Sequence, residues 1–149
     1  MRIIIAFFTA VLFSGAGFAD IDTNRSNLIG LWQVENGHDD NMKSLWVFEG
    51  KGEVIRITHS KNSQIVAEVE CKATGSDCEA IEDGRRAKVS LYFNGSMLVA
   101  LVTQGSEVFK RRFTVQVQDS MAIELIPIVP DGKLQTFKLK RVKSNSAQE

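Results

Sequence analysis

The sequence has little of what marks several large classes of protein. Its 149 residues contain only 2 prolines and 11 glycines, which excludes a collagen-like or proline-rich chain. Net charge is also missing, because 18 basic residues balance 18 acidic ones. Binding to nucleic acid needs a clustered excess of lysine and arginine, so no such partner is expected. The hydrophobic fraction of 44% argues against disorder and indicates one soluble globular domain.

Motifs for catalysis are missing as well. Only His38 and His59 offer an imidazole, and no nucleophile elbow, His-Glu-x-x-His segment or phosphate-binding glycine loop occurs. We therefore expect no enzyme and no cofactor. The run His38-Asp39-Asp40 offers one nitrogen and two carboxylates that could bind a divalent metal. A solvated acidic loop is the commoner meaning of such a run, so no metal site is predicted.

Only one long hydrophobic run is present, and it lies at the N-terminus. Arg2 supplies a positive charge, Ile3 to Phe13 is apolar apart from Thr9, and Gly17 to Ala19 supplies small residues for cleavage. This order is typical of a secretory signal peptide, predicted over residues 1–19. A transmembrane anchor would need about 20 apolar residues, more than this run provides.

Cleavage would leave a chain that begins at Asp20, without an integral membrane segment. The short signal is of bacterial type, so the predicted location is the periplasm or the medium. We predict one domain over residues 20–142 and a flexible polar tail over residues 143–149.

Export to an oxidising compartment makes the two cysteines interpretable. Cys71 and Cys78 enclose a turn-rich segment, and we predict a disulfide between them. Such a short loop gains only about 2.5 kcal/mol, so the bond would hold a local loop in place. A metal pair or a redox couple is the alternative, but neither a Cys-x-x-Cys spacing nor neighbouring histidines support it.

Strand patterns fill most of the remaining chain. Apolar and polar residues alternate from Gln64 to Cys71 and from Arg86 to Phe93, as in half-buried strands. Asn94-Gly95 then gives the clearest hairpin turn. Seven further strands are predicted: Gly30 to Glu35, Leu45 to Glu49, Glu53 to His59, Ser96 to Thr103, Val108 to Gln118, Met121 to Ile128 and Leu134 to Val142.

These strands are joined by short turns, with no convincing long helix between them. Parallel strands need long crossover connections, so the pattern indicates an antiparallel meander. Closing the meander into a barrel removes exposed strand edges. We predict an all-β fold, an antiparallel up-and-down β-barrel of about eight to nine strands, with a β-sandwich as the alternative.

The two ends of the predicted barrel carry a family resemblance. Gly30-Leu31-Trp32 resembles the Gly-x-Trp that opens the first strand of lipocalins and related calycins. The last predicted strand places Arg141 on the same face as Leu139, and a last-strand arginine packs over the first-strand tryptophan in that family. The resemblance implies a lipocalin-like barrel closed by a cation–π contact between Arg141 and Trp32.

Two polar side chains fall on the apolar faces of predicted strands. Arg111 shares a face with Phe109 and Phe113, and His59 shares a face with Ile57. An arginine inside the barrel holds the ligand's carboxylate in fatty-acid-binding calycins, so Arg111 and His59 are candidate contacts for an anionic amphiphile. The alternatives are a bulge that turns Arg111 outward and an exposed His59 at the end of its strand.

Three functions suit such a barrel. The first, favoured by the family resemblance, is an exported binding protein for a small hydrophobic or anionic amphipathic ligand. The second is an inhibitor or immunity-type protein that binds a partner enzyme through its loops. The third is an accessory envelope protein whose barrel is filled. Large predicted interior residues favour a filled barrel: Phe48, Phe93, Phe109, Phe113, Phe137, Leu91, Leu101 and Leu139.

Overall fold

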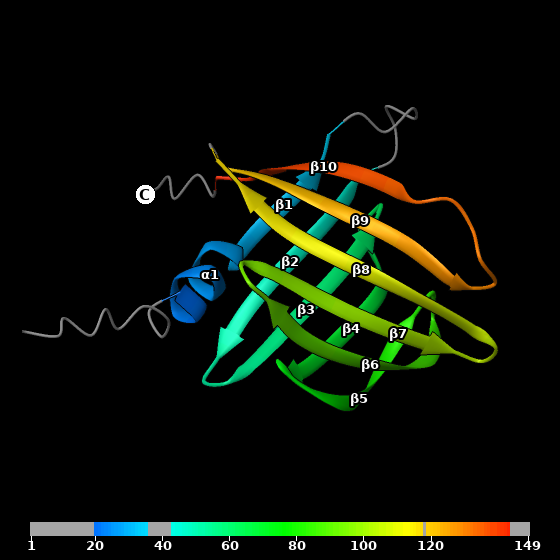
Figure 1. Ribbon diagram of the computed structural model, residues 1–149. Coiled ribbons are helices and arrows are strands. Elements are labelled where there is room, and N and C mark those ends of the chain that lie inside the picture. Colours follow the sequence, from blue (N-terminus) through cyan, green and yellow to red (C-terminus); the bar gives the residue numbers. More distant parts are fainter. Residues whose placement is uncertain (1–19, 36–42, 118, 144–149) are drawn as a thin grey trace, which may run out of the picture.

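The computed structural model describes residues 20–35, 43–117 and 119–143, which form one helix and a closed antiparallel barrel (Figure 1). Each strand pairs with the next along the chain, and β1 pairs with β10 to close the barrel. The elements are α1 (Asp20–Leu28), β1 (Gly30–Val34), β2 (Ser44–Lys51), β3 (Val54–Lys61), β4 (Gln64–Lys72), β5 (Thr74–Glu82), β6 (Arg85–Asn94), β7 (Met97–Gln104), β8 (Glu107–Gln116), β9 (Ser120–Val129) and β10 (Gln135–Arg141).

The predicted all-β up-and-down barrel is confirmed, but it has ten strands and not eight or nine. The strand that the sequence did not indicate is β5, whose first half, Thr74 to Asp77, is polar and exposed. Local propensity does not predict a strand there. The segment is extended because it pairs with β6 along most of its length and with β4 near its end, so tertiary pairing overrides propensity.

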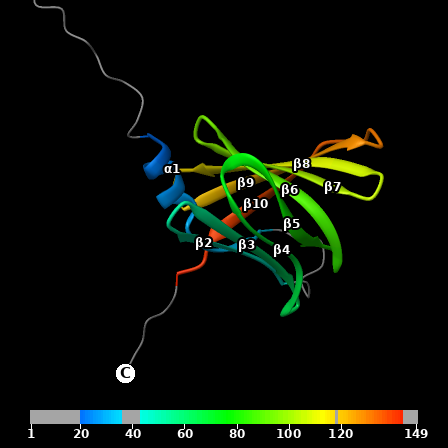
Figure 2. The same cartoon turned by 90° about the horizontal axis from the view of Figure 1, so that it is seen from below.

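Helix α1 was not expected either. Its sequence is polar and has no apolar stripe, but its last residue, Leu28, is buried in the core. The helix lies at one end of the barrel, as Figures 1 and 2 show. Arg25 ties it there by donating a hydrogen bond to the carbonyl oxygen of Val54, 2.8 Å away.

The meander places alternate turns at opposite ends of the barrel. The turns after β2, β4, β6 and β8 lie at the end that α1 covers, and those after β3, β5, β7 and β9 lie at the other end, called the mouth below (Figure 1). The predicted Asn94-Gly95 turn is present between β6 and β7. Gly95 has a φ of 62°, a conformation that glycine adopts at little cost.

The predicted Cys71–Cys78 disulfide is confirmed, with Cα atoms 5.9 Å apart. It joins two strands, where a local loop was expected. Backbone pairing between β4 and β5 spans only three residue pairs, ending at Val69 and Ala80. The disulfide lies two residues beyond that last pair, so it holds the seam together where the ladder stops.

The core fills the barrel. Most of the predicted interior residues are buried or partly buried there, but Leu101 and Phe137 are not in the core. Leu101 lies between buried Ala100 and Val102 on β7, so its side chain points to the outer face. Phe137 is 40% exposed. β10 pairs with β1 only from Leu139 onward, so among the described residues β1 does not extend beside Phe137.

Candidate functional site

A buried ion pair lies inside the barrel. Arg111 on β8 points inward and binds the carboxylate of Glu82, the last residue of β5. One guanidinium nitrogen, Nη1, donates to Oε2 at 2.9 Å, and Nη2 donates to Oε1. The two side chains are only 15% and 6% exposed. This two-bond arrangement matches a planar guanidinium to a planar carboxylate.

Aromatic rings flank the same guanidinium. Its central carbon lies 5.4 Å from the centre of the Trp46 ring and 4.9 Å from that of Phe109. Such contacts stabilise a cation that has lost much of its water. A register shift does occur in β8, between Val108 and Phe109, but Arg111 still faces the interior. The alternative of an outward Arg111 is therefore not what the structure adopts.

His59 on β3 belongs to the same interior cluster. Its ring stacks on Trp46 with centroids 4.0 Å apart, and its Nε2 lies 2.9 Å from the hydroxyl oxygen of Ser44. Burial, and then the positive charges of Arg111 and Lys61, lower the pKa of His59 from 6.5 to about 3. The imidazole is therefore neutral at pH 7, and Arg111 is the cation of this cluster.

The interior leaves almost no free space around these groups. A cavity of about 20 Å³ is bounded by Trp46, His59, Glu82, Arg111 and Phe113, together with Glu68 and aliphatic residues. A volume of this size holds roughly one water molecule. The barrel interior has no room for a hydrocarbon chain in this conformation.

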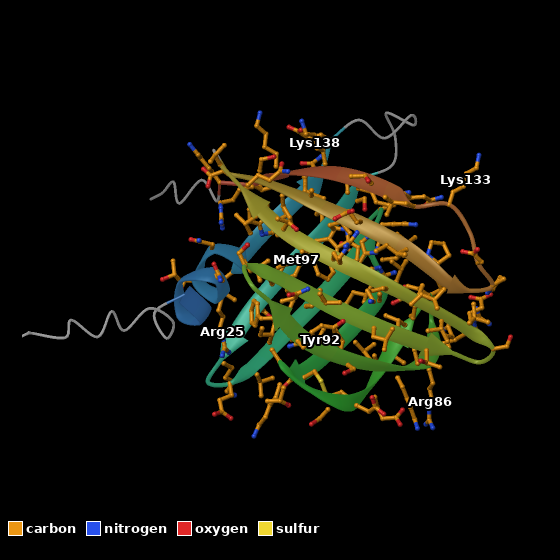
Figure 3. All side chains as sticks on the ribbon, viewed as in Figure 1. Arg25, Arg86, Tyr92, Met97, Lys133 and Lys138 are labelled. Atoms are coloured by element: carbon orange, nitrogen blue, oxygen red, sulfur yellow. A yellow bond between two sulfur atoms is a disulfide. The ribbon has the colours of Figure 1, made fainter. Side chains whose placement is uncertain are left out.

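A larger hollow opens at the mouth. It has a volume of about 320 Å³, and we call it the mouth groove. Arg111 and Glu82 line it as well as the interior cavity, so the ion pair separates the two spaces. Figure 3 shows Lys133 near this end of the barrel and Arg25 at the opposite end. The other lining residues are Asp83, Glu107, Val108, Phe109, Leu125, Pro127, Val129 and Pro130.

At the opposite end, Arg141 covers Trp32. The guanidinium carbon lies 4.3 Å from the centre of the Trp32 ring, which is fully buried. Arg141 also donates hydrogen bonds to the carbonyl oxygens of Ile29 and Asn27, each at 2.7 Å, and pairs with Asp119. These contacts connect the last strand to the residues that precede the first one.

The Gly-x-Trp segment has a physical explanation in the same contacts. Gly30 has a φ of 140°, and a Cβ atom there would lie 2.5 Å from Nη1 of Arg141. A side chain at this position would therefore push Arg141 away. Trp32 in turn donates a hydrogen bond from its indole nitrogen to the carbonyl oxygen of Leu28 at 2.9 Å.

Several expectations concern residues outside the described part of the chain. These are the signal peptide over residues 1–19, the His38-Asp39-Asp40 run, and the tail beyond Lys143. Within residues 20–35, 43–117 and 119–143, no group of histidine, cysteine, aspartate and glutamate side chains could hold a metal ion. No helix in those ranges is long and apolar enough to span a membrane.

Sequence reasoning missed Glu82. The residue shares the inward face of β5 with Ala80, and this alternation could have indicated it. The sequence analysis predicts no strand over this segment, however, so it assigns no face to its residues. Arg111 therefore had no predicted partner, although the two residues meet across 29 positions of sequence.

No family model matches, and no curated protein sequence matches either. The "REP1-NXSQ fatty acid transporter" superposes with a TM-score of 0.66 at 17% identity, covering 79% of this chain and 98% of that one. Echinococcus granulosus fatty-acid-binding protein 1 gives 0.67 at 12% identity, covering 79% and 99% of the two chains.

A third similar structure is the Schistosoma mansoni fatty acid binding protein in complex with arachidonic acid. Its TM-score is 0.67 at 14% identity, covering 80% of this chain and 99% of that one. The protein thus has the fold of the small calycin-type β-barrels, as the sequence resemblance implied. At identities this low, the likeness concerns the fold alone.

Proposed function

We propose that this chain is an exported binding protein for a small anionic amphiphile, whose acidic head binds Arg111. The observation that carries the proposal is the buried Arg111–Glu82 pair at the inner end of the mouth groove. An apolar pair of similar volume often stabilises a barrel interior as well or better. The fold itself therefore does not require this cation, and ligand binding gives a reason for it.

Proteins of known structure with the same fold support this proposal. They are a fatty acid transporter and two fatty-acid-binding proteins, one of them in complex with arachidonic acid. A fatty acid is an anionic amphiphile of the kind that Arg111 suits. Binding without catalysis is the activity proposed here.

His59 has a different role in the proposed site. Because burial keeps its imidazole neutral, it adds no positive charge to attract an anion. It holds Trp46 by stacking and bonds to Ser44, and Trp46 in turn lies beside Arg111. His59 therefore positions the aromatic wall that flanks the guanidinium.

Export is the other part of the proposal, with the periplasm or the medium as the location. Its support is the signal pattern over residues 1–19 and the disulfide, which is the bond expected in an oxidising compartment.

The first test is native mass spectrometry of the protein purified from the exported fraction, followed by extraction of any bound compound. The purified protein is then titrated with dodecanoate. A double variant, Glu82→Leu with Arg111→Met, removes both charges without leaving either unpaired, so it should fold. We expect dodecanoate to bind the parent and not this variant. Equal binding by both would disprove the role of Arg111.

A second candidate function is the binding of an exported partner protein, and exposed apolar residues near the mouth favour it. Ile65, Val129 and Leu134 are 59%, 50% and 53% exposed. Apolar residues gathered on a surface mark interaction sites. Under this alternative the protein purifies without a bound amphiphile, and changing Val129 and Leu134 to serine abolishes capture of a defined exported enzyme.

A further inference from the structure

Glu82 holds Arg111 in the way that a ligand's carboxylate would hold it. We propose that Glu82 is a resident counter-ion, which an incoming monocarboxylate displaces from Arg111, and that the ligand's hydrocarbon chain then lies in the mouth groove and not in the interior. This inference rests on the proposed function. It adds where the ligand lies, what it replaces, and which charge it carries.

The ion pair defines the chemistry of the head group. Arg111 uses two parallel hydrogen bonds to hold the Glu82 carboxylate, at Oε1 and Oε2. A guanidinium bound in this way is set for a planar carboxylate, which is the group that can replace Glu82 bond for bond. An alcohol or an amine cannot make this exchange.

The backbone of Glu82 stays in place when the side chain leaves. Its carbonyl oxygen accepts a hydrogen bond from Nε2 of Gln104 at 2.6 Å, and its backbone pairs with Ala67 and Arg85 on the two neighbouring strands. Displacement is therefore a rotation of the side chain alone. Glu82 already lines the mouth groove, so that rotation carries its carboxylate toward water.

A new partner for the displaced carboxylate is close by. Arg85 follows the turn after Glu82 and is exposed. Its Nη2 donates a hydrogen bond to Oε1 of Gln104 at 3.4 Å, and Gln104 is the residue that holds the Glu82 backbone. A rotated Glu82 carboxylate therefore moves toward a cation and solvent. This lowers the cost of breaking the buried pair.

The available space places the hydrocarbon chain. The interior cavity of about 20 Å³ has room for roughly one water molecule. The mouth groove of about 320 Å³ is within the size range of small-molecule sites, and its walls include Phe109, Leu125, Pro127 and Val129. A chain whose head sits on Arg111 can extend only into the groove without repacking the core.

Charge in the groove restricts the ligand further. Asp83 and Glu107 also line it, so it carries two carboxylates besides Glu82. A ligand with a second negative charge along its chain would be repelled by these side chains. The ligand class is therefore a single-chain amphiphile with one carboxylate at its end.

The main experiment compares dodecanoate with dodecanol on the parent and on Glu82→Gln, using the fluorescence of Trp46, which lies beside Arg111. Removing the competing carboxylate should tighten dodecanoate binding by about tenfold or more, since a tenfold change needs only about 1.4 kcal/mol. Dodecanol should be unaffected. Glu79→Gln, which removes an exposed charge from the same strand, is the matched control and should leave both affinities unchanged.

A second pair of variants tests the location. Val129 lines the groove, whereas its neighbour Ile128 has comparable exposure and is not among the residues that line it. Val129→Asp should weaken dodecanoate binding about tenfold, and Ile128→Asp should not. Ala100→Val partly fills the interior cavity and should leave binding unchanged. Loss of binding in Ala100→Val with full binding in Val129→Asp would overturn the groove assignment.

The results separate this inference from the function on which it rests. If the parent binds dodecanoate through Arg111 but Glu82→Gln binds no more tightly, the function stands and the counter-ion role is wrong. If neither protein binds dodecanoate, both are wrong. Should Glu82→Gln fail to fold, the carboxyl carbon signal of Glu82 in the parent is followed by NMR. It should shift with dodecanoate and not with dodecanol, and an unchanged signal in bound protein would refute displacement.

Discussion

Arg111 and His59 are neighbours in the same apolar interior, yet their charges differ. Arg111 carries the positive charge that a guanidinium has in proteins, and Glu82 and two aromatic rings surround it. His59 loses its charge because burial and nearby cations oppose protonation. Each residue therefore contributes differently, Arg111 by pairing with the Glu82 carboxylate and His59 by stacking on the Trp46 ring.

The lowered pKa of His59 makes stability depend on pH. Between about pH 6.5 and pH 3 the unfolded chain binds a proton at His59 that the folded chain does not. His59 therefore does not reduce the free energy of unfolding above pH 6.5. As the pH is lowered through this window, His59 lowers that free energy by an amount on the order of a few kcal/mol.

His59→Phe keeps an aromatic ring against Trp46 and cannot titrate. Urea unfolding of parent and variant from pH 3 to 8 measures the difference between their free energies of unfolding. Carboxylates titrate in both proteins, so their effect cancels in this difference. We expect the parent to lose more stability than the variant as the pH falls, because only the parent carries His59. Parallel pH profiles would show that His59 is not the group responsible.

Trp32 and Arg141 make a second prediction at the residue scale. Trp32→Ala removes a fully buried ring and should cost about 3–5 kcal/mol of unfolding free energy. Arg141→Ala should also destabilise, by about 1.5–3 kcal/mol, because two carbonyl oxygens lose a charged donor. Lys140→Ala, which removes an exposed neighbour, is the control. A Trp32→Ala protein as stable as the parent would rule out the closure role.

At the scale of elements, the seam between β4 and β5 is among the shortest in the barrel. It has three residue pairs, whereas β8 and β9 share nine. The seam also bears on the site, because Glu82 is the last residue of β5 and pairs across it. The disulfide beyond the last pair therefore supports the strand that presents the counter-ion to Arg111.

Replacing both cysteines by alanine tests this support. The free energy of unfolding should fall by about 2.5 kcal/mol, as expected for closure of so short a loop. Reducing agent should destabilise the parent by a similar amount and leave the variant unchanged. A parent that resists unfolding equally well before and after verified reduction would contradict a stabilising role for the Cys71–Cys78 bond.

At the scale of the whole molecule, the two ends of the barrel are built differently. Helix α1 and the Trp32–Arg141 contact cover one end, while the mouth carries the groove and the ion pair. The interior between them is filled by large side chains. Access to Arg111 is therefore from the mouth, and the proposed ligand would enter at the end far from α1.

Export is a prediction about the whole chain. When the full sequence is expressed in a bacterial host, the protein recovered from the periplasm should begin at Asp20 and lack residues 1–19. Intact mass and N-terminal sequencing measure this. A chain found only in the cytoplasm with Met1 to Ala19 still attached would contradict the proposed location.

Most of the strands were predictable from the sequence because their signals are local. Side chains alternate with period two, and residues such as Asn94-Gly95 mark turns within a few positions. The segments that were missed give weaker local signals, because α1 has no apolar stripe and β5 alternates only in its second half. β5 is held extended by its pairing with β4 and β6, and α1 is held by contacts such as that of Arg25 with Val54. Glu82 was missed with β5.

The sequence by itself therefore determined the all-β meander, the inward face of Arg111 and the pairing of the two cysteines, because each depends on near neighbours in the chain. Only the tertiary structure decided that Glu82 meets Arg111 and that the interior is filled while a groove remains at the mouth. The physical reason is that closing a barrel brings opposite walls together, and the partners and volumes that result depend on residues far apart in sequence.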